Sequence, residues 1–355
     1  FMDLLRLRFP VNEKSSGVVS VSSPGRLLSM HIYYDREKGI LQFNQRDAID
    51  ALANKLGITN DRTKRKILPI DPNLDLPKYL APQDNVNTTD YLSIVGSCLH
   101  ICQVSRPDCS FAVGVLSRHS ATAGAIQMTA TQNLVQYMFH TRNLSIQYTR
   151  TAQGNSPEIY ERDSFAHDEQ RKTLLHQESL TRTIEERLVA GLPDNLANDP
   201  AHYADADLGG CRNTRRSTTG YITTMNGGPI VWGSKLQKLC ALSSAESEIY
   251  AVLDSVKEAL HIKLLCEECG IRPPGIPMTI WEDNNACIQL GHNLRGSNAA
   301  KHFEMRLRLL NEHIWERNIE FSRINTTDQL ADGFTKPLPF VAFTAFRDQI
   351  MVLRD

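Results

Sequence analysis

The order of strand-like and helix-like segments after residue 199 restricts the fold of this chain more than any other feature. HYADAD (202–207) has the pattern of a buried strand, and STTGYITTMNGGPIVWGS (217–234) predicts a β-hairpin that turns at Asn226-Gly227-Gly228. Two further strand-like runs, MTIWE (278–282) and NIEFSRI (318–324), alternate with helix-like segments. Strands that begin as a meander and then alternate with helices predict an α/β fold with a five-stranded mixed sheet and flanking helices.

The sequence of this second half contains signals for where helices begin and end. Ser243 and Glu246 fit a capping box at the start of a long helix, which we expect to end near Gly270. Its apolar residues recur at helical spacing; they are Ile249, Val252, Leu253, Val256, Leu260 and Leu264. KHFEMRLRLLNEHIWER (301–317) predicts an amphipathic helix, and TDQLADGFTK (327–336) predicts the start of the last one.

The first 150 residues have a different pattern, which predicts a smaller and mostly helical domain with a β-hairpin. GRLLSMHIYY (25–34) and ILQFNQ (40–45) are strand-like runs joined by turn residues, and LSIQY (144–148) is a closing strand. Four helical stretches lie between them, at 46–57, 89–104, 108–119 and 127–140. Residues 151–198 are polar and acidic, so we expect three parts: 1–150, an acidic linker over 151–198, and 199–355.

Composition limits the class of protein. The 355 residues include no apolar run near the roughly 20 residues of a membrane span, so we expect no membrane partner. The eight cysteines are scattered, which is typical of reduced thiols in an intracellular protein. Residues 1–150 hold 17 Lys and Arg against 12 Asp and Glu, a balance of +5 that permits contact with a polyanion.

Acidic residues stand at the ends of several expected elements in the second half. Asp205 is near the end of a strand and Glu248 is in the second turn of the long helix; Asp283 and Asp332 each follow a strand. Each has an ordinary explanation as a turn, cap or surface residue, and Asp205 with Asp207 would also fit an Asx turn. Together they suit hard divalent cations, because Mg²⁺ takes oxygen ligands. Two such ions can activate a water and stabilise the leaving oxygen of a phosphodiester.

The order of motifs resembles the ribonuclease H domain of copia-type retrotransposon Pol polyproteins. The matching motifs are YADAD, STTGY, GGPIVWGSKLQK, LSSAESEIYAV, EDNNACIQL, KHFEMR and DQLADGFTKPL. Upstream, DREKGILQFNQ and YLSIVGSCLHICQVSRPDCSFAVGVLSRH resemble the end of the reverse transcriptase and its thumb- or connection-like region. The resemblance covers nearly the whole chain, with Leu208 where the family usually has Trp.

The resemblance implies an enzyme, a ribonuclease H-like endonuclease that cleaves the RNA strand of RNA–DNA hybrids with two Mg²⁺ or Mn²⁺ ions. It places the catalytic and metal-binding acids at Asp205, Glu248, Asp283 and Asp332, and leaves Asp207 to the following loop. It also implies the rest of the polyprotein as a partner, in cytoplasmic virus-like particles or the nucleus. The polymerase's aspartates would lie upstream of residue 1, so we do not expect polymerisation. The alternative is a domesticated or defective scaffold that binds nucleic acid without cutting it.

Contacts to the hybrid are expected from polar residues beside the acids. Ser244 and Asn285 are placed to reach 2′-hydroxyls across the minor groove, and Arg215 belongs to a basic cluster that suits phosphates. The alternatives are a helix cap, a surface amide and a solvated charge. His302 is a candidate for proton transfer or product release, or a structural residue at a helix start.

Overall fold

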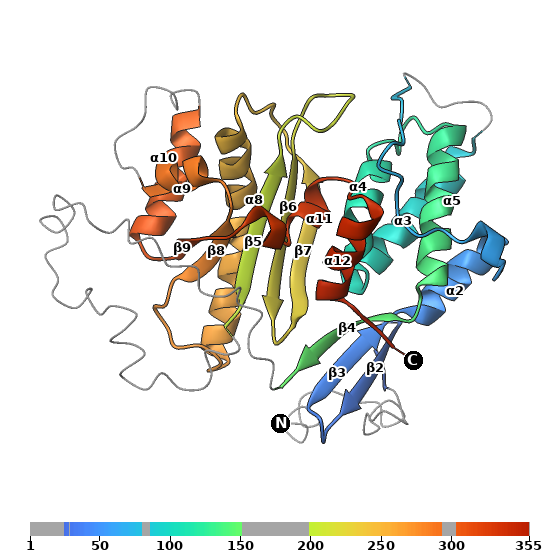
Figure 1. The fold of residues 1–355 in the computed structure, drawn as a ribbon, viewed down its shortest axis with the longest axis horizontal. Helices are drawn as coiled ribbons and strands as arrows, with labels where there is room; N and C mark the ends of the chain where they lie inside the picture. Colours follow the sequence, from blue (N-terminus) through green and yellow to red (C-terminus); the bar gives the residue numbers. More distant parts are fainter. Residues whose placement is uncertain (1–24, 28, 80–85, 151–198, 293–302, 355) are drawn as a thin grey trace, which may run out of the picture.

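The computed structural model describes residues 25–27, 29–79, 86–150, 199–292 and 303–354, which form two β-sheets with helices packed on them (Figure 1). The first sheet has the order β1-β2-β3-β4-β10, and each neighbouring pair is antiparallel. Its strands are β1 (Gly25–Leu27), β2 (Met30–Asp35), β3 (Ile40–Asn44), β4 (Leu144–Thr149) and β10 (Val352–Leu353). The expected hairpin is therefore part of a larger sheet, which the last strand of the chain completes.

The stretch 25–34 is not the single strand that its composition predicts. It divides into β1 and β2, which pair with each other in the register Gly25↔Ile32. The division is at Ser29, whose φ of 68° lies in the left-handed region and allows a tight turn. The turn shortens the strand without changing the fold class.

Helices cover the first sheet at one end. They are α2 (Arg46–Lys55), α3 (Thr88–Val104), α4 (Ser110–Ser117) and α5 (Ala125–His140), with short 3₁₀ turns η2 (Arg62–Lys64) and η3 (Pro107–Cys109). The side chain of Asn87 caps α3 by accepting hydrogen bonds from the N–H groups of Thr89 and Asp90. The expected helix at 108–119 begins as η3, because Pro107 at its first position fixes a tight first turn.

The second sheet has the order β7-β6-β5-β8-β9. Its strands are β5 (Ala201–Asp207), β6 (Thr218–Met225), β7 (Gly228–Leu236), β8 (Met278–Glu282) and β9 (Ile319–Arg323). β6 is antiparallel to β5 and β7, whereas β8 is parallel to β5 and β9. The hairpin turns at Asn226 and Gly227, both with positive φ. The predicted α/β fold with a five-stranded mixed sheet is confirmed.

The helices of this half lie on the second sheet, except for the last one, which packs against the first half. They are α8 (Ser244–Glu268), α9 (Asn285–His292), α10 (Glu304–Trp315), α11 (Asp332–Thr335) and α12 (Phe340–Ile350), with the 3₁₀ turn η6 (Thr326–Asp328). α8 packs along β5 and β6, and with α9 and α10 it encloses a core that includes Ile249, Ile280 and Leu310. The expected last helix is interrupted instead, because Pro337 and Pro339 separate α11 from α12.

The other face of the second sheet shares its core with the first half of the chain. One continuous cluster of buried residues joins Leu134 and Val113 with Tyr203, Ile222 and Phe334. α12 and β10 return to the first half, and the end of the chain lies beside β4 (Figure 1). The described residues of the second half therefore pack on those of the first half through a shared core.

Polar contacts reinforce this junction at β7. The Trp232 indole donates to the Cys102 carbonyl (2.9 Å), and the Tyr148 hydroxyl donates to the Pro229 carbonyl (2.6 Å). The Thr149 N–H donates to the carbonyl of Asn226 (2.9 Å). The hairpin tip of one sheet is therefore hydrogen-bonded to a strand of the other.

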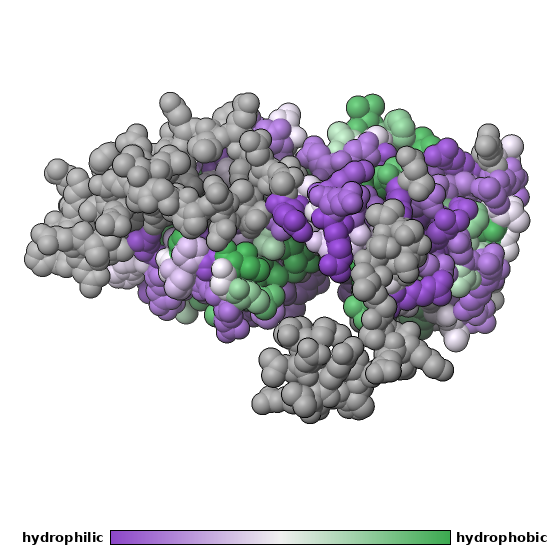
Figure 2. All heavy atoms as spheres, turned by 90° about the horizontal axis from the view of Figure 1, so that it is seen from below, coloured by the Kyte–Doolittle hydropathy of each residue, from purple (hydrophilic) through white to green (hydrophobic). Residues whose placement is uncertain are grey.

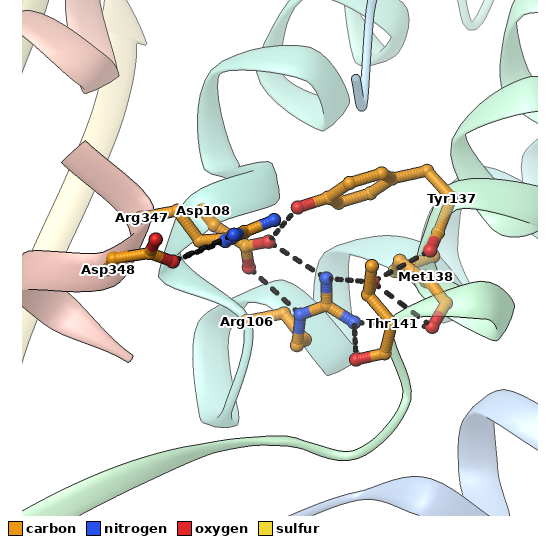
Figure 3. A network of polar contacts seen from close by, with 7 residues as sticks. All are labelled: Arg106, Asp108, Tyr137, Met138, Thr141, Arg347 and Asp348. Atoms are coloured by element: carbon orange, nitrogen blue, oxygen red, sulfur yellow. Dashed lines mark hydrogen bonds and ion pairs between the residues drawn. The ribbon is translucent and has the colours of Figure 1, made fainter. Parts of the chain in front are cut away.

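A buried ion pair lies where α5 and α12 meet η3 (Figure 3). Arg106 and Asp108 are 2.8 Å apart, and the Tyr137 hydroxyl donates to Asp108 (2.8 Å). Burial favours the neutral acid, but the charge and hydrogen bonds of Arg106 outweigh it and lower the pKa of Asp108. Arg106 also donates to the Thr141 hydroxyl (2.8 Å), so the network fixes the end of α5.

The surface of the described residues is mixed in character. Seen from below, hydrophilic residues dominate the right-hand part, and hydrophobic groups lie left of the centre and at the upper right (Figure 2). Among the described helices, none combines the length and apolar character needed to cross a membrane.

Candidate metal centre

Three of the expected acids converge at one end of the second sheet. Asp205 is near the end of β5, Glu248 is in the second turn of α8, and Asp283 directly follows β8. One carboxylate oxygen from each lies within 4.8 Å of the others, and Asp205 and Glu248 are both buried. The strands β5 and β8 run parallel, so their carboxyl ends meet at the same edge of the sheet.

Asp332 lies beside this trio as the first residue of α11. Its Oδ1 accepts a hydrogen bond from Lys336 Nζ at 2.6 Å, and its carboxylate is a close electrostatic neighbour of Asp205. The Thr335 hydroxyl donates to Asp205 Oδ2 (2.8 Å), which fixes that carboxylate against α11. The geometry thus groups Asp205, Glu248 and Asp283 most tightly and places Asp332 at their edge with a lysine.

Burial and mutual repulsion oppose ionisation of these acids. Burial, and then the charge of Asp332, raise the pKa of Asp205 to about 7. Burial, followed by the charge of Glu282, raises the pKa of Glu248 well above its usual value. Glu248 Oε2 is buried and has no hydrogen-bond partner among the described residues. Carboxylate oxygens that repel one another and lack partners are the donor set that Mg²⁺ or Mn²⁺ would satisfy.

The structure adds one acid that the sequence did not single out. Glu282, the last residue of β8, is completely buried, and its Oε2 also lacks a partner in the described part of the chain. Its Oε1 accepts from the Asn284 N–H at 3.0 Å. The alternation of the strand could have indicated the burial of Glu282. Met278, Ile280 and Glu282 share the buried face of β8, so this carboxylate lies in the core.

The two neighbouring acids have other partners. Asp207 accepts from the backbone N–H of Thr218 across the β5–β6 ladder and is not among the converging carboxylates. Glu246 Oε2 accepts from the Leu242 N–H (2.7 Å), and Ser243 Oγ accepts from the Glu246 N–H (3.2 Å). The Ser243 contact is the expected helix cap, whereas Glu246 Oε2 reaches the N–H one residue before the cap; this contact distinguishes Glu246 from Glu248.

The expected hybrid-binding residues lie on the surface around this end of the sheet. Arg215 is exposed in the β5–β6 connection, where its φ of 55° places it in a tight turn. Ser244 and Asn285 are exposed as the first residues of α8 and α9, the helices that carry or follow the acids. His302 lies outside the described residues.

Comparisons with known proteins give homologues over most of the chain. A Pol polyprotein from transposon TNT 1-94 of Nicotiana tabacum is 26% identical over 331 residues, 92% of this chain and 21% of that protein. One from transposon RE1 of Arabidopsis thaliana is 27% identical over 89% of this chain and 18% of that protein. The chain therefore spans about a fifth of the length of these relatives. The secreted RxLR effector protein 161 of Plasmopara viticola is 29% identical over 48% of this chain and 90% of its own length.

The homologues from Nicotiana tabacum and Arabidopsis thaliana are retrovirus-related Pol polyproteins of copia-type transposons, as the order of motifs indicates. No family model matches the chain. Among solved structures, a ribonuclease H1 isolated from compost is 13% identical, covers 39% of this chain and aligns with a TM-score of 0.31. A ribonuclease H1 from Halobacterium salinarum is 11% identical and aligns with a TM-score of 0.30.

Proposed function

We propose that this chain is the ribonuclease H-bearing part of a copia-type Pol polyprotein and hydrolyses the RNA strand of RNA–DNA hybrids. The observation that carries the proposal is the convergence of Asp205, Glu248 and Asp283, whose carboxylate oxygens lie within 4.8 Å of one another. In this reading residues 199–355 are the nuclease domain, 1–150 are the thumb- or connection-like region, and 151–198 are the linker. The partners are the hybrid and the rest of the polyprotein, in cytoplasmic particles or the nucleus.

The residues of the chain have separate roles in this proposal. Asp205, Glu248 and Asp283 hold the ions, and Asp332 completes the set from α11, where Lys336 balances its charge (2.6 Å). Two bound divalent ions would supply activation of the attacking water and stabilisation of the leaving oxygen. The Thr335 hydroxyl of α11 keeps Asp205 in place, so the ligand geometry is set before the substrate arrives.

Recognition of the hybrid belongs to the exposed residues around the acids. Ser244 and Asn285 are at the first positions of α8 and α9 and suit contacts with 2′-hydroxyls, and Arg215 suits a phosphate. His302 is proposed to assist proton transfer or product release. Cleavage at the proposed centre leaves a 3′-hydroxyl and a 5′-phosphate.

The test is cleavage of a hybrid labelled in the RNA strand, with Mg²⁺ and with EDTA, by the full chain and by Asp283→Asn. The substitution removes one ligand charge at nearly constant volume, and the amide oxygen can still accept from Thr326 (2.7 Å), so folding is retained. We expect loss of cleavage of at least 10²-fold, the scale on which active-site groups contribute. Asp254→Asn, an exposed acid on α8, is the control.

Near wild-type turnover of Asp283→Asn, or cleavage that persists in EDTA, would contradict the proposal. Binding of the hybrid with no cleavage by the wild-type chain under any divalent ion would instead support a scaffold that binds nucleic acid without cutting it.

A further inference from the structure

A cavity of about 400 Å³ lies between the two halves of the chain, next to the candidate metal centre. One wall is formed by residues 70–78 and by α4 with the two residues that follow it, Arg118 and His119. The opposite wall is formed by the β5–β6 connection and by Lys336. The cavity therefore belongs to neither half alone.

Two buried polar atoms on the first wall have no hydrogen-bond partner among the described residues. They are Nε of Arg118 and Nδ1 of His119. His119 is only 3% exposed, and Arg118 is held in place because its Nη2 donates to the Thr218 hydroxyl across the cavity at 3.2 Å. A fixed guanidinium with a free N–H inside a polar cavity is an incomplete site, which a ligand with acceptor oxygens would complete.

Charged residues of both signs line the cavity. Its acids are engaged: Asp75 lies 3.5 Å from Arg212, Asp207 accepts from the Thr218 N–H, and Asp71 accepts from the Asn73 N–H at 2.9 Å. Two cations, Lys78 and Arg118, form no ion pair within the described part of the chain. Asp207 is an electrostatic neighbour of Arg118, and Lys78 and Arg118 are the lining cations that a phosphate oxygen could meet without displacing an ion pair.

Two residues that line the cavity, Lys336 and Asp207, also lie next to acids of the proposed metal centre. Lys336 donates to Asp332 (2.6 Å), and Asp207 follows Asp205 by two residues on β5, a separation of roughly 7 Å along a strand. A polyanion bound at the acids would thus pass the mouth of the cavity.

We propose that this cavity seats a backbone phosphodiester of the bound nucleic acid, with Arg118 as its main donor and Lys78 and His119 beside it. The planar guanidinium matches the paired oxygens of a phosphate, and the two halves of the chain together hold one strand close to the reacting phosphodiester. This inference rests on the proposed function, because it assumes that the strand at the acids is a nucleic acid.

The experiment measures the affinity of the full chain for a fluorescein-labelled 20-bp RNA–DNA hybrid by fluorescence anisotropy, between 50 and 300 mM salt. The parent is Asp283→Asn, so that the proposed cleavage does not interfere. Arg118→Gln and Lys78→Gln are each expected to weaken binding about tenfold. Each should reduce the slope of log affinity against log salt by about 0.7–0.9, the amount expected for one lost phosphate contact. Arg26→Gln, an exposed arginine on β1, is the control and should change neither quantity.

Unchanged affinity and slope in both cavity variants would overturn the inference while leaving hybrid cleavage by the wild-type chain intact. If Arg118→Gln fails to fold, Lys78→Gln decides, because Lys78 is exposed. If hybrid binding depends on Arg118 and Lys78 but the wild-type chain does not cleave the hybrid, the inference stands and the proposed activity is rejected. Stabilisation of the parent by inorganic phosphate, combined with unchanged hybrid affinity in the variants, would assign the cavity to a free anion and overturn the proposal.

Discussion

Acid should destabilise this protein through His202, a completely buried histidine on β5. Its ring nitrogens lie 2.8 Å from the Thr223 hydroxyl and 3.0 Å from the Ser255 hydroxyl. Burial opposes the charged form and lowers the pKa of His202 from 6.5 to about 3. The folded state therefore keeps this imidazole neutral at a pH where the unfolded chain binds a proton.

The sign and the size of the change in unfolding free energy with pH follow from proton linkage. Well above pH 6.5 the histidine is neutral in both states and contributes no pH dependence. As the pH falls from 6.5 toward 3, only the unfolded state takes up the proton, so the free energy of unfolding decreases by about 1.4 kcal/mol per pH unit. At pH 5 the accumulated loss from this one residue is about 2 kcal/mol.

The assay is urea unfolding of the full chain at pH 7.5 and pH 5.0, followed by tryptophan fluorescence. His202→Gln should be less stable than wild type at pH 7.5, because the hydrogen bonds to Thr223 and Ser255 are altered. Its stability should fall by about 2 kcal/mol less between the two pH values, since the other titrating groups are common to both proteins. His261→Gln, at an exposed position on α8, is the control and should keep the wild-type difference. An equal pH dependence in wild type and His202→Gln would refute the reasoning.

Three further outcomes are expected. Arg106→Met should cost about 3–5 kcal/mol of unfolding free energy, because it leaves the buried Asp108 without its cation; urea unfolding measures this. Gly228→Ala should cost about 1–3 kcal/mol, because a β-carbon there would meet the backbone of β4, whereas Gly96→Ala on α3 has open space and should be neutral or stabilising. Mg²⁺ at about 100 times its dissociation constant should stabilise the wild type by about 2.7 kcal/mol in thermal unfolding, and Asp283→Asn should lose most of that gain.

The elements with local signals could be predicted from the sequence. The Asn226-Gly227 turn fixed the β6–β7 hairpin, and the Ser243 cap located the start of α8, so the mixed sheet followed from residues close together in the chain. The converging acids followed for the same reason, because each occupies the end of an element whose type was clear. Asp332 was located at the start of a helix, and its partner Lys336 has the i,i+4 spacing at which an acid and a base meet on a helix.

The remaining features depend on contacts between distant segments. The burial of Glu282 depends on how α8 covers β8, and the cavity at Arg118 exists only where α4 meets the β5–β6 connection. The core shared by the two halves could not be predicted from the sequence. The apolar residues of β5 and β6 are compatible with a sheet covered by helices of either half. Pro337 and Pro339 are a sequence signal for the break of the last helix, because proline disfavours a continuous helix.

The return of α12 and β10 to the first half means that the chain is interlaced. β10 adds the edge strand beside β4, and Phe343 and Ile350 of α12 are buried in the core shared by both halves. A peptide bond hydrolysed between residues 150 and 199 would therefore leave two fragments that stay associated through that core. Separately expressed fragments should recover the native assembly only together, by complementation, and neither could be transplanted as a freestanding module.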